Sequence, residues 1–210
     1  MATLVSYALT DVASVKESLG IDAGVTTQDN LIIRKINQAT EMIEGYCSLA
    51  YGHHFASTTY TNEEYDGSGS NQLSLKMRPV TALTSFQRRN SSINADDWDD
   101  IESDIYFSDL NAGVIDLNFT QGTGWGGYRV TYTAGYTTIP ADLAEACVML
   151  AGYLVDNSSS GGSAVKKKQE GARAIEYFNP NEASSGSLIG QLGLDDMLAR
   201  YKNYVLLEDK

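Results

Sequence analysis

The chain has 210 residues, of which 42% are hydrophobic and 20% charged, so it can bury a substantial core. Its 27 acidic side chains outnumber the 15 basic ones, and the net charge of −12 at pH 7 argues against non-specific binding to nucleic acid or to an anionic membrane. The longest apolar run, residues 146–155, is about half the length of a membrane-spanning helix. With no signal-peptide pattern and only two cysteines, we expect a soluble protein made in a reducing cytoplasm.

Two helices are predicted in the first 50 residues. Thr10 or Asp11 caps a short helix that ends at Leu19, before Gly20. From Gln28 to about Tyr46, apolar residues recur at steps of three and four, which is typical of a helix with one buried face. These apolar positions are Leu31 or Ile32, Ile36, Ala39, Ile43, and Tyr46 or Cys47.

The middle of the chain predicts an antiparallel β unit. Alternating or β-rich stretches, divided by turn residues, predict strands at 58–65, 73–75, 80–87, 114–119 and 128–132. The polar residues 88–113 predict irregular structure, and the glycines before Tyr128 predict a hairpin turn.

After Pro140, a second apolar stripe predicts a helix that ends near Asn157. Residues 157–163 are almost wholly Ser and Gly and predict a flexible linker. Residues 166–178 are ambiguous between helix and strand, 179–187 predict a loose stretch, and 194–206 predict a terminal helix.

These elements predict an α+β fold: a mainly α-helical bundle with a small inserted antiparallel β unit and an extended C-terminal segment that ends in a helix. We expect residues 1–56 and 135–157 to form the helical core, 57–134 the β insertion with an acidic loop, and 158–210 the linker and C-terminal segment.

Several motifs match sites of chemistry only in part. Gly122, Gly124 and Gly127 match a dinucleotide-binding fingerprint by letter, but a strand rather than a helix is predicted after them. The adjacent His53 and His54 lack a second ligand pair with zinc spacing, and a loop role is the favoured interpretation. Cys47 and Cys147 lie on or beside the apolar stripes and are interpreted as buried hydrophobic residues, which would approach one another if the two helices pack together.

The chain also has two charged clusters. The acidic run lacks the spacing of a calcium loop, so a solvated loop is favoured over a cation site; it comprises Asp96, Asp97, Asp99, Asp100, Glu102 and Asp104. The basic run Lys166–Lys168 is too short for convincing DNA binding, which leaves a solvated patch or a contact with an acidic partner. No pair of carboxylates is singled out for catalysis, so we expect no enzymatic activity and no cofactor or metal.

Taken in order, four stretches resemble the head-to-tail adaptor (connector, or head completion) proteins of tailed bacteriophages. The first is a helix that ends in Ala39, Met42–Glu44 and Tyr46–Cys47. The others are the turn 65–69 leading to Pro79–Val80, the strand 130–135 followed by the helix from Ile139 to Leu154, and Ile175–Tyr177 before a terminal helix.

The resemblance implies a non-enzymatic ring, usually of twelve subunits, in the virion neck. Such a ring lies beneath the portal, extends the channel for double-stranded DNA and docks a stopper or tail component. Family members usually reach the portal through the C-terminal segment, here with candidate residues Leu188, Ile189, Leu194, Met197, Leu198, Tyr201, Tyr204 and Val205.

The charge distribution suits such a channel, because an acidic lumen repels the phosphates of passing DNA. Residues 60–120 hold 11 acidic and 4 basic side chains. We therefore expect the β insertion and its acidic loop to face the lumen or the neighbour on the tail side. The alternatives are another neck or tail-completion protein and, because the C-terminal part also looks like phage proteins labelled DnaT-like, an accessory protein that binds single-stranded DNA.

Overall fold

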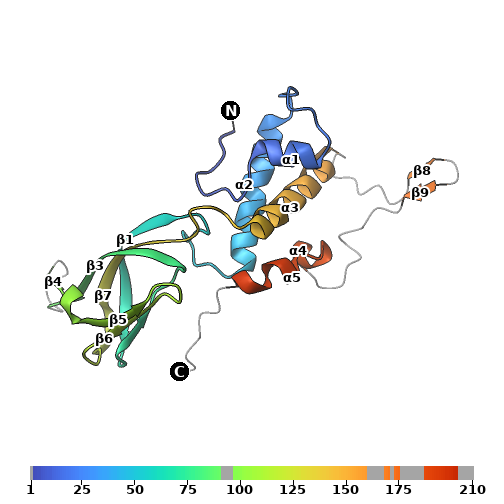
Figure 1. The fold of residues 1–210 in the computed structure, drawn as a ribbon. Coiled ribbons are helices and arrows are strands. Elements are labelled where there is room, and N and C mark those ends of the chain that lie inside the picture. The colour runs from blue at the N-terminus through green and yellow to red at the C-terminus, as the bar shows by residue number, and fades with distance from the viewer. Residues whose placement is uncertain (1, 91–96, 160–167, 171–172, 176–186, 203–210) are drawn as a thin grey trace. The chain divides into compact units, whose positions relative to one another are not determined.

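The computed structural model describes residues 2–90, 97–159, 168–170, 173–175 and 187–202. Within them the chain forms two compact units, one drawn from Met1–Leu49 and Ile139–Tyr204 and the other from Ala50–Thr138 (Figure 1). The first unit is helical and the second is built of strands. Each is described by itself.

Three helices form the centre of the helical unit. Helix α1 (Val12–Ser18) begins where the Asp11 carboxylate accepts a hydrogen bond from the Ser14 N–H, as the sequence predicts. Helices α2 (Asp29–Tyr46) and α3 (Ala141–Ser159) pack against each other and bury the predicted stripes, so both predictions are confirmed. The side chain of Leu19, just after α1, lies 3.5 Å from the position that a Cβ atom at Gly152 of α3 would occupy. Helix α1 therefore packs closely against α3.

The N-terminal segment follows α2 through hydrogen bonds that the sequence did not reveal. The backbone N–H groups of Ala2, Val5 and Leu9 donate hydrogen bonds to side chains on α2, which are those of Asn30, Asn37 and Thr40 respectively. These bonds satisfy backbone donors in a segment that has no regular structure of its own.

Two antiparallel sheets form most of the β unit. One has the strand order β1-β7-β3-β4, with β1 at Thr58–Ser68, β7 at Thr123–Ala134, β3 at Val80–Arg89 and β4 at Trp98–Asp100. The other has the order β2-β6-β5, with β2 at Gln72–Ser74, β6 at Val114–Leu117 and β5 at Ile105–Asp109. A 3-10 turn, η1 (Glu102–Asp104), precedes β5, and both sheets contribute buried residues, among them Phe86, Ile115, Tyr128 and Tyr132.

The first and last segments of the β unit lie side by side. The Tyr136 N–H donates to the Phe55 carbonyl at 2.7 Å, and the Ser57 N–H donates to the Tyr136 carbonyl at 3.0 Å. At Gly135, where φ is +102°, an added Cβ would lie 2.7 Å from the Phe55 carbonyl oxygen, so only glycine fits this crossing.

The prediction of a mainly α-helical bundle is wrong, because the protein is a mixed fold with two antiparallel sheets of comparable weight to the helices. Residues 88–113, predicted to be irregular, contribute the end of β3, all of β4 and all of β5. The predicted turn glycines Gly124 and Gly127 lie inside β7. Pairing with β1, β3 and β6 holds these acidic or glycine-rich stretches in strands, although their own β propensity is low.

The C-terminal part also differs from the prediction. Instead of one helix over 194–206, the structure has α4 (Leu188–Gln191), α5 (Asp195–Leu198) and the 3-10 turn η2 (Ala199–Tyr201), while 203–206 lie outside the described residues. Gly193, with φ at +69°, separates α4 from α5. Helix α3 extends to Ser159, and within 166–178 the strands β8 (Lys168–Glu170) and β9 (Arg173–Ile175) pair with each other. The rest of the linker, including Lys166 and Lys167, lies outside the described residues.

Candidate functional site

Residues 187–202, here called the C-terminal arm, carry most of the residues predicted to bind a partner. Ile189, Leu194 and Leu198 are buried within the helical unit. Leu188, Met197 and Tyr201 are half-buried, and Tyr204 and Val205 lie outside the described residues. The side chains that the sequence singled out as a docking surface are therefore, in part, already packed against their own chain.

The arm rests on the end of α2 and the start of α3, here called the arm seat (Tyr46, Cys47 and Asp142). Asp142 accepts a 2.6 Å hydrogen bond from the Tyr201 hydroxyl and forms an ion pair with Arg200. The Tyr46 hydroxyl donates to Asp195, and the Lys202 ammonium group lies 4.3 Å from the centre of the Tyr46 ring. One acidic and one aromatic side chain of the seat thus bind four residues of the arm.

Both cysteines are buried and free, which confirms the interpretation that they are small core residues. The Cys47 sulfur lies 4.0 Å from the Leu198 carbonyl oxygen, directly under the arm. The Cys147 sulfur lies 3.8 Å from the Thr40 hydroxyl, between α3 and α2. Burial raises the pKa of each thiol to about 12, so neither is a reactive thiolate near neutral pH.

The structure describes the predicted acidic loop from Asp97 onward, and Asp96 lies outside the described residues. Asp99, Asp100 and Glu102 are exposed, whereas Asp97 and Asp104 are half-buried. The Asp100 carboxylate accepts the Glu102 N–H at 3.1 Å, and Asp104 accepts the Asn118 side-chain amide at 3.2 Å. These hydrogen bonds hold the loop in a defined conformation, which projects carboxylates from β4 and η1.

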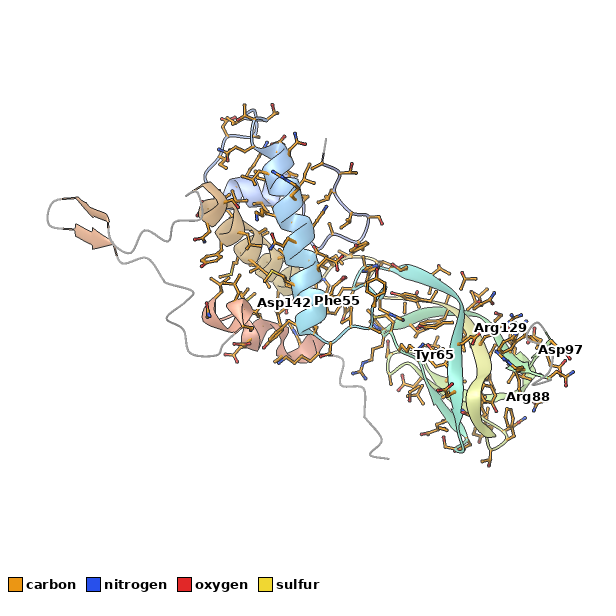
Figure 2. The ribbon with its side chains drawn as sticks, turned by 180° about the vertical axis from the view of Figure 1, so that it is seen from behind. Phe55, Tyr65, Arg88, Asp97, Arg129 and Asp142 are labelled. Atoms are coloured by element: carbon orange, nitrogen blue, oxygen red, sulfur yellow. The ribbon has the colours of Figure 1, made fainter. Side chains whose placement is uncertain are left out.

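A cluster of arginines, which the sequence analysis missed, lies beside this acidic surface (Figure 2). The guanidinium carbons of Arg89 and Arg129 lie 4.8 and 4.4 Å from the centre of the Trp98 ring. Arg129 also donates to the Gln87 side chain, and Arg89 pairs with Glu64 at 3.6 Å. The sheet register produces the cluster, because Arg89 pairs with Trp98 while Gln87 pairs with both Asp100 and Arg129. The negative field at this end of the sheet is therefore partly compensated.

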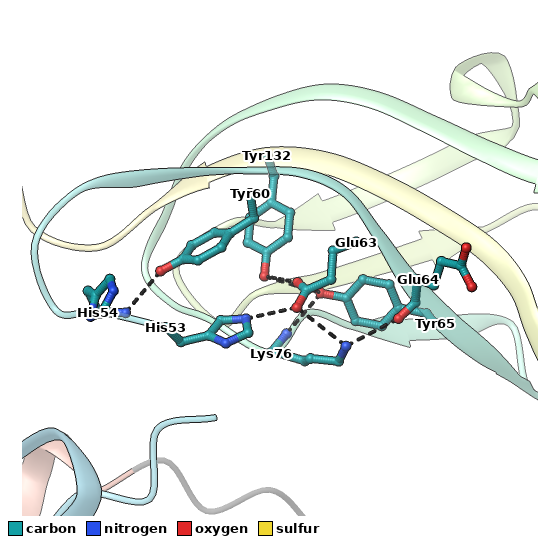
Figure 3. Close-up of polar contacts among 8 residues, drawn as sticks. All are labelled: His53, His54, Tyr60, Glu63, Glu64, Tyr65, Lys76 and Tyr132. Carbon is teal, nitrogen blue, oxygen red and sulfur yellow. Dashed lines mark hydrogen bonds and ion pairs between the residues drawn. The ribbon is translucent and has the colours of Figure 1, made fainter. Parts of the chain in front are cut away.

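A buried polar network surrounds Glu63 in the β unit (Figure 3). Its Oε1 lies 2.8 Å from Nε2 of His53 and 3.3 Å from the Lys76 ammonium group. Its Oε2 accepts hydrogen bonds of 2.7 Å from the hydroxyls of Tyr65 and Tyr132. The His53 ring also stacks on Tyr60, with ring centres 4.6 Å apart. His53 is therefore a core residue of the β unit.

The network shifts the ionisation of its members. Burial alone would raise the pKa of Glu63, but the hydrogen bonds from His53, Tyr132 and Tyr65 outweigh it and lower that pKa to about 2. The hydrogen bond to Glu63 raises the pKa of His53 above 6.5, against the opposing effect of burial. Burial raises the pKa values of the Tyr65 and Tyr132 hydroxyls far above their ordinary range. The ionised Glu63 carboxylate is thus held inside the β unit by the Lys76 ammonium group, by the His53 ring and by two protonated tyrosine hydroxyls.

Among the described residues, no group of three or more His, Cys, Asp or Glu side chains could hold a metal ion. In the same part of the chain, no helix is long and apolar enough to cross a membrane. Gly122, Gly124 and Gly127 do not precede a helix, so the dinucleotide fingerprint lacks the strand–turn–helix context that it requires.

A family model and several solved structures match this chain. A family model described as head completion protein matches residues 8–170. Among solved structures, the chain matches a protein in the neck of an empty gene transfer agent (GTA) particle computed with C6 symmetry, at 16% identity, and one in the neck of the native particle computed with C12 symmetry, at 15% identity. A chain in the virion of the native gene transfer agent also matches, at 15% identity. Each match has a TM-score of 0.55 and covers 99% of this chain and 96% of the other, and no curated protein sequence matches.

Proposed function

This chain belongs to the head completion protein family, and on that premise we propose that it is a structural adaptor in the neck of a tailed particle. The observation that carries the proposal is the extent of the family match, which runs from the end of the N-terminal segment through the β unit and α3. The resemblance noted in the sequence is thereby confirmed at the level of the family. The likeness in fold to proteins of gene transfer agent necks and virions supports the location.

In this proposal the subunits form a ring, of about twelve copies, beneath the portal. A relative of the same fold lies in a neck computed with C12 symmetry, which supports the number. The ring extends the DNA channel and offers its other side to a stopper or tail component. Its role is mechanical and electrostatic, with no turnover of substrate.

The charge of the chain supports the channel. Each subunit carries a net charge of −12, and the surface of β4 and η1 exposes Asp99, Asp100 and Glu102. Carboxylates along a lumen repel the DNA backbone and keep it from adhering, whereas Lys and Arg would bind it through counterion release. We place this surface toward the lumen or the tail-side neighbour.

The C-terminal arm and the residues after it are the proposed contact with the portal. The test is to mix the full chain with the portal protein of the same particle and to image the mixture by electron microscopy. A closed ring of this protein seated on the portal is the expected result. A chain that ends at residue 186 should form no such complex but should fold its β unit, and so keep the near-ultraviolet circular dichroism that comes from the buried Tyr65, Tyr128 and Tyr132. The proposal fails if the full chain does not bind, or if the shortened chain binds equally well.

A further inference from the structure

The four-stranded sheet β1-β7-β3-β4 has one face that carries polar side chains on every strand. Residues directly opposite one another on neighbouring strands project from the same face. The register places four such residues in one row across this face: Glu64, Arg129, Gln87 and Asp100. Arg89 and Trp98 form the next pair along the same face. The row is therefore acidic at both ends, with the two arginines between the carboxylates.

Trp98 and Gln87 hold the two guanidinium groups in place. Both groups lie within 5 Å of the centre of the Trp98 ring, at 4.8 Å for Arg89 and 4.4 Å for Arg129. Arg129 also donates a hydrogen bond from Nε to the side-chain oxygen of Gln87. A side chain that is already held in this way loses little conformational entropy when a ligand binds to it.

The β unit compensates these two charges only weakly. Within the described part of the chain, the terminal nitrogen atoms of Arg129 have no hydrogen bond or ion pair. Nε of Arg89 is buried and has no acceptor among the same residues. Arg89 pairs with Glu64 at 3.6 Å, which is too long for a hydrogen bond, and the Glu64 side chain is 57% exposed. An acceptor supplied from outside would therefore be favourable.

A glycine keeps the space beside Arg89 open. Gly126 has a φ of +57°, and its N–H donates to the Asp66 carboxylate at 2.6 Å. A Cβ atom at this position would lie 3.3 Å from Nη2 of Arg89 and 3.0 Å from Oε2 of Glu64. A larger residue would thus occupy the approach to the guanidinium group, which glycine leaves available to a ligand.

We propose that Arg89 and Arg129 form a binding site for one phosphate group, carried either by a DNA backbone or by a free phosphate ion. The planar N–H donors of a guanidinium group match the spacing of phosphate oxygens, and Arg binds them in pairs. The carboxylates of Glu64 and Asp100 at the ends of the row repel any further phosphate, so the site takes a single group.

This site goes beyond the proposed adaptor function and does not depend on it. On DNA it would add one weak contact per subunit to a surface that otherwise repels the backbone. A contact of this strength exchanges quickly, so it is compatible with DNA that moves past the subunit.

Trp98 reports on the site, because its ring contacts both guanidinium groups. The chain has two tryptophans, so Trp125→Phe in the full-length protein leaves Trp98 as the source of the fluorescence. This variant is titrated at constant ionic strength with sodium phosphate, with a short DNA duplex and with a glutamate-rich peptide. We expect a saturable change in fluorescence, half complete at about 1 mM phosphate.

Two kinds of substitution test the role of the arginines. Arg89→Lys and Arg129→Lys keep the positive charge but lose the paired donors, so each should weaken binding about tenfold. Glu64→Gln removes the carboxylate that competes for Arg89 and should strengthen binding about threefold. Glu145→Gln makes the same change of charge on α3 and should leave the affinity unchanged. A purely structural role for the arginines predicts no gain of affinity in Glu64→Gln.

The probes distinguish the sources of the phosphate group. Saturation by the duplex alone assigns the site to the DNA backbone, and saturation by sodium phosphate alone assigns it to the free ion; either result supports the site. The inference is overturned if neither phosphate probe gives a saturable change up to about 20 mM phosphate, or if Glu64→Gln and Glu145→Gln bind alike. It also fails if only the glutamate-rich peptide binds, because the partner is then an acidic protein surface. The adaptor function stands whichever result is obtained.

Discussion

His53 Nε2 lies 2.8 Å from Glu63 Oε1, so the segment that enters the β unit is tied to β1 by an ion pair with an exposure of only 8% for the histidine and 14% for the glutamate. An ion pair at this depth is costly to break, because removal of one partner leaves the other charged and buried. We therefore expect the pair to contribute to the pH dependence of the stability of the β unit.

We predict that this stability is greatest between about pH 4.5 and 6.5. The pKa of Glu63 is lowered to about 2 from 4.5, so the unfolded chain takes up the proton more readily and stability falls as the pH drops below about 4.5. The pKa of His53 is raised above 6.5, so its contribution is complete below pH 6.5 and is lost as the pH rises through the folded value. Urea unfolding followed by tyrosine circular dichroism at pH 3 to 9 measures the profile.

Glu63→Gln is the matched control for that profile. It keeps the shape of the side chain but should lower the free energy of unfolding by about 3 kcal/mol near pH 6 and flatten both flanks of the curve. An unchanged pH profile in this variant would show that other groups set it.

Gly135→Ala should destabilise the β unit strongly. Alanine would have to adopt a φ of +102° and place its Cβ 2.7 Å from the Phe55 carbonyl oxygen, so the loss should be at least about 3 kcal/mol. Gly20→Ala also has a positive φ, at +66°, but meets nothing within 4 Å, so it should lose only about 1 kcal/mol. Thermal unfolding of the two variants separates the cost of the steric contact from the cost of a positive φ. Equal losses would contradict the crossing described here.

Arg129→Ala should weaken the join between β4 and the rest of its sheet. The change removes a guanidinium group over Trp98 and a hydrogen bond to Gln87, and should lower the free energy of unfolding by about 1–2 kcal/mol. Hydrogen exchange at the amides of 98–100 should become faster. Arg78→Ala, a change in an exposed arginine outside the cluster, is the control; an equal effect in both would refute a specific role for the stack.

Neutralising the acidic surface tests the proposed lumen or tail-side role. Asp99→Asn, Asp100→Asn and Glu102→Gln together keep the shape of the surface and remove three exposed charges per subunit. We expect slower DNA passage or weaker docking of the tail-side neighbour, measured by packaging and ejection assays on assembled particles. Glu17→Gln, Glu41→Gln and Glu145→Gln change the net charge equally on the helical unit. If both sets behave like the native protein, the acidic loop is only solvated.

The helices were predictable because one periodicity describes each. Ile32, Ile36, Ala39 and Ile43 on α2 are all fully buried, as the steps of three and four require. No comparable pattern exists for β4, since Trp98, Asp99 and Asp100 form a strand only because β3 pairs with them. Where pairing with a neighbouring strand outweighs local propensity, the sequence of a single segment is not enough to predict a strand.

The network around Glu63 was missed for a different reason. Strict alternation along β1 would place Tyr60 and Tyr65 on opposite faces of the strand. A shift of register between Tyr60 and Glu63, with Asn62 at a φ of +52°, brings both tyrosines and Glu63 to the same side. A bulge of one residue is invisible to a period-two pattern, so His53 had no predicted partner. Similarly, residues 194–206 were predicted as one helix because Leu194, Met197, Leu198 and Tyr201 have helical spacing, whereas α5 ends at Leu198 and the chain continues as the 3-10 turn η2.

The hydrogen bonds that join Phe55 and Ser57 to Tyr136 hold together the two ends of the β unit. Because its first and last segments are bonded to each other, this unit can accept a longer distant loop or additional charged residues without distorting the helical unit. Proteins with this fold can in this way vary the β unit to fit differently shaped neighbours and keep the same helical unit.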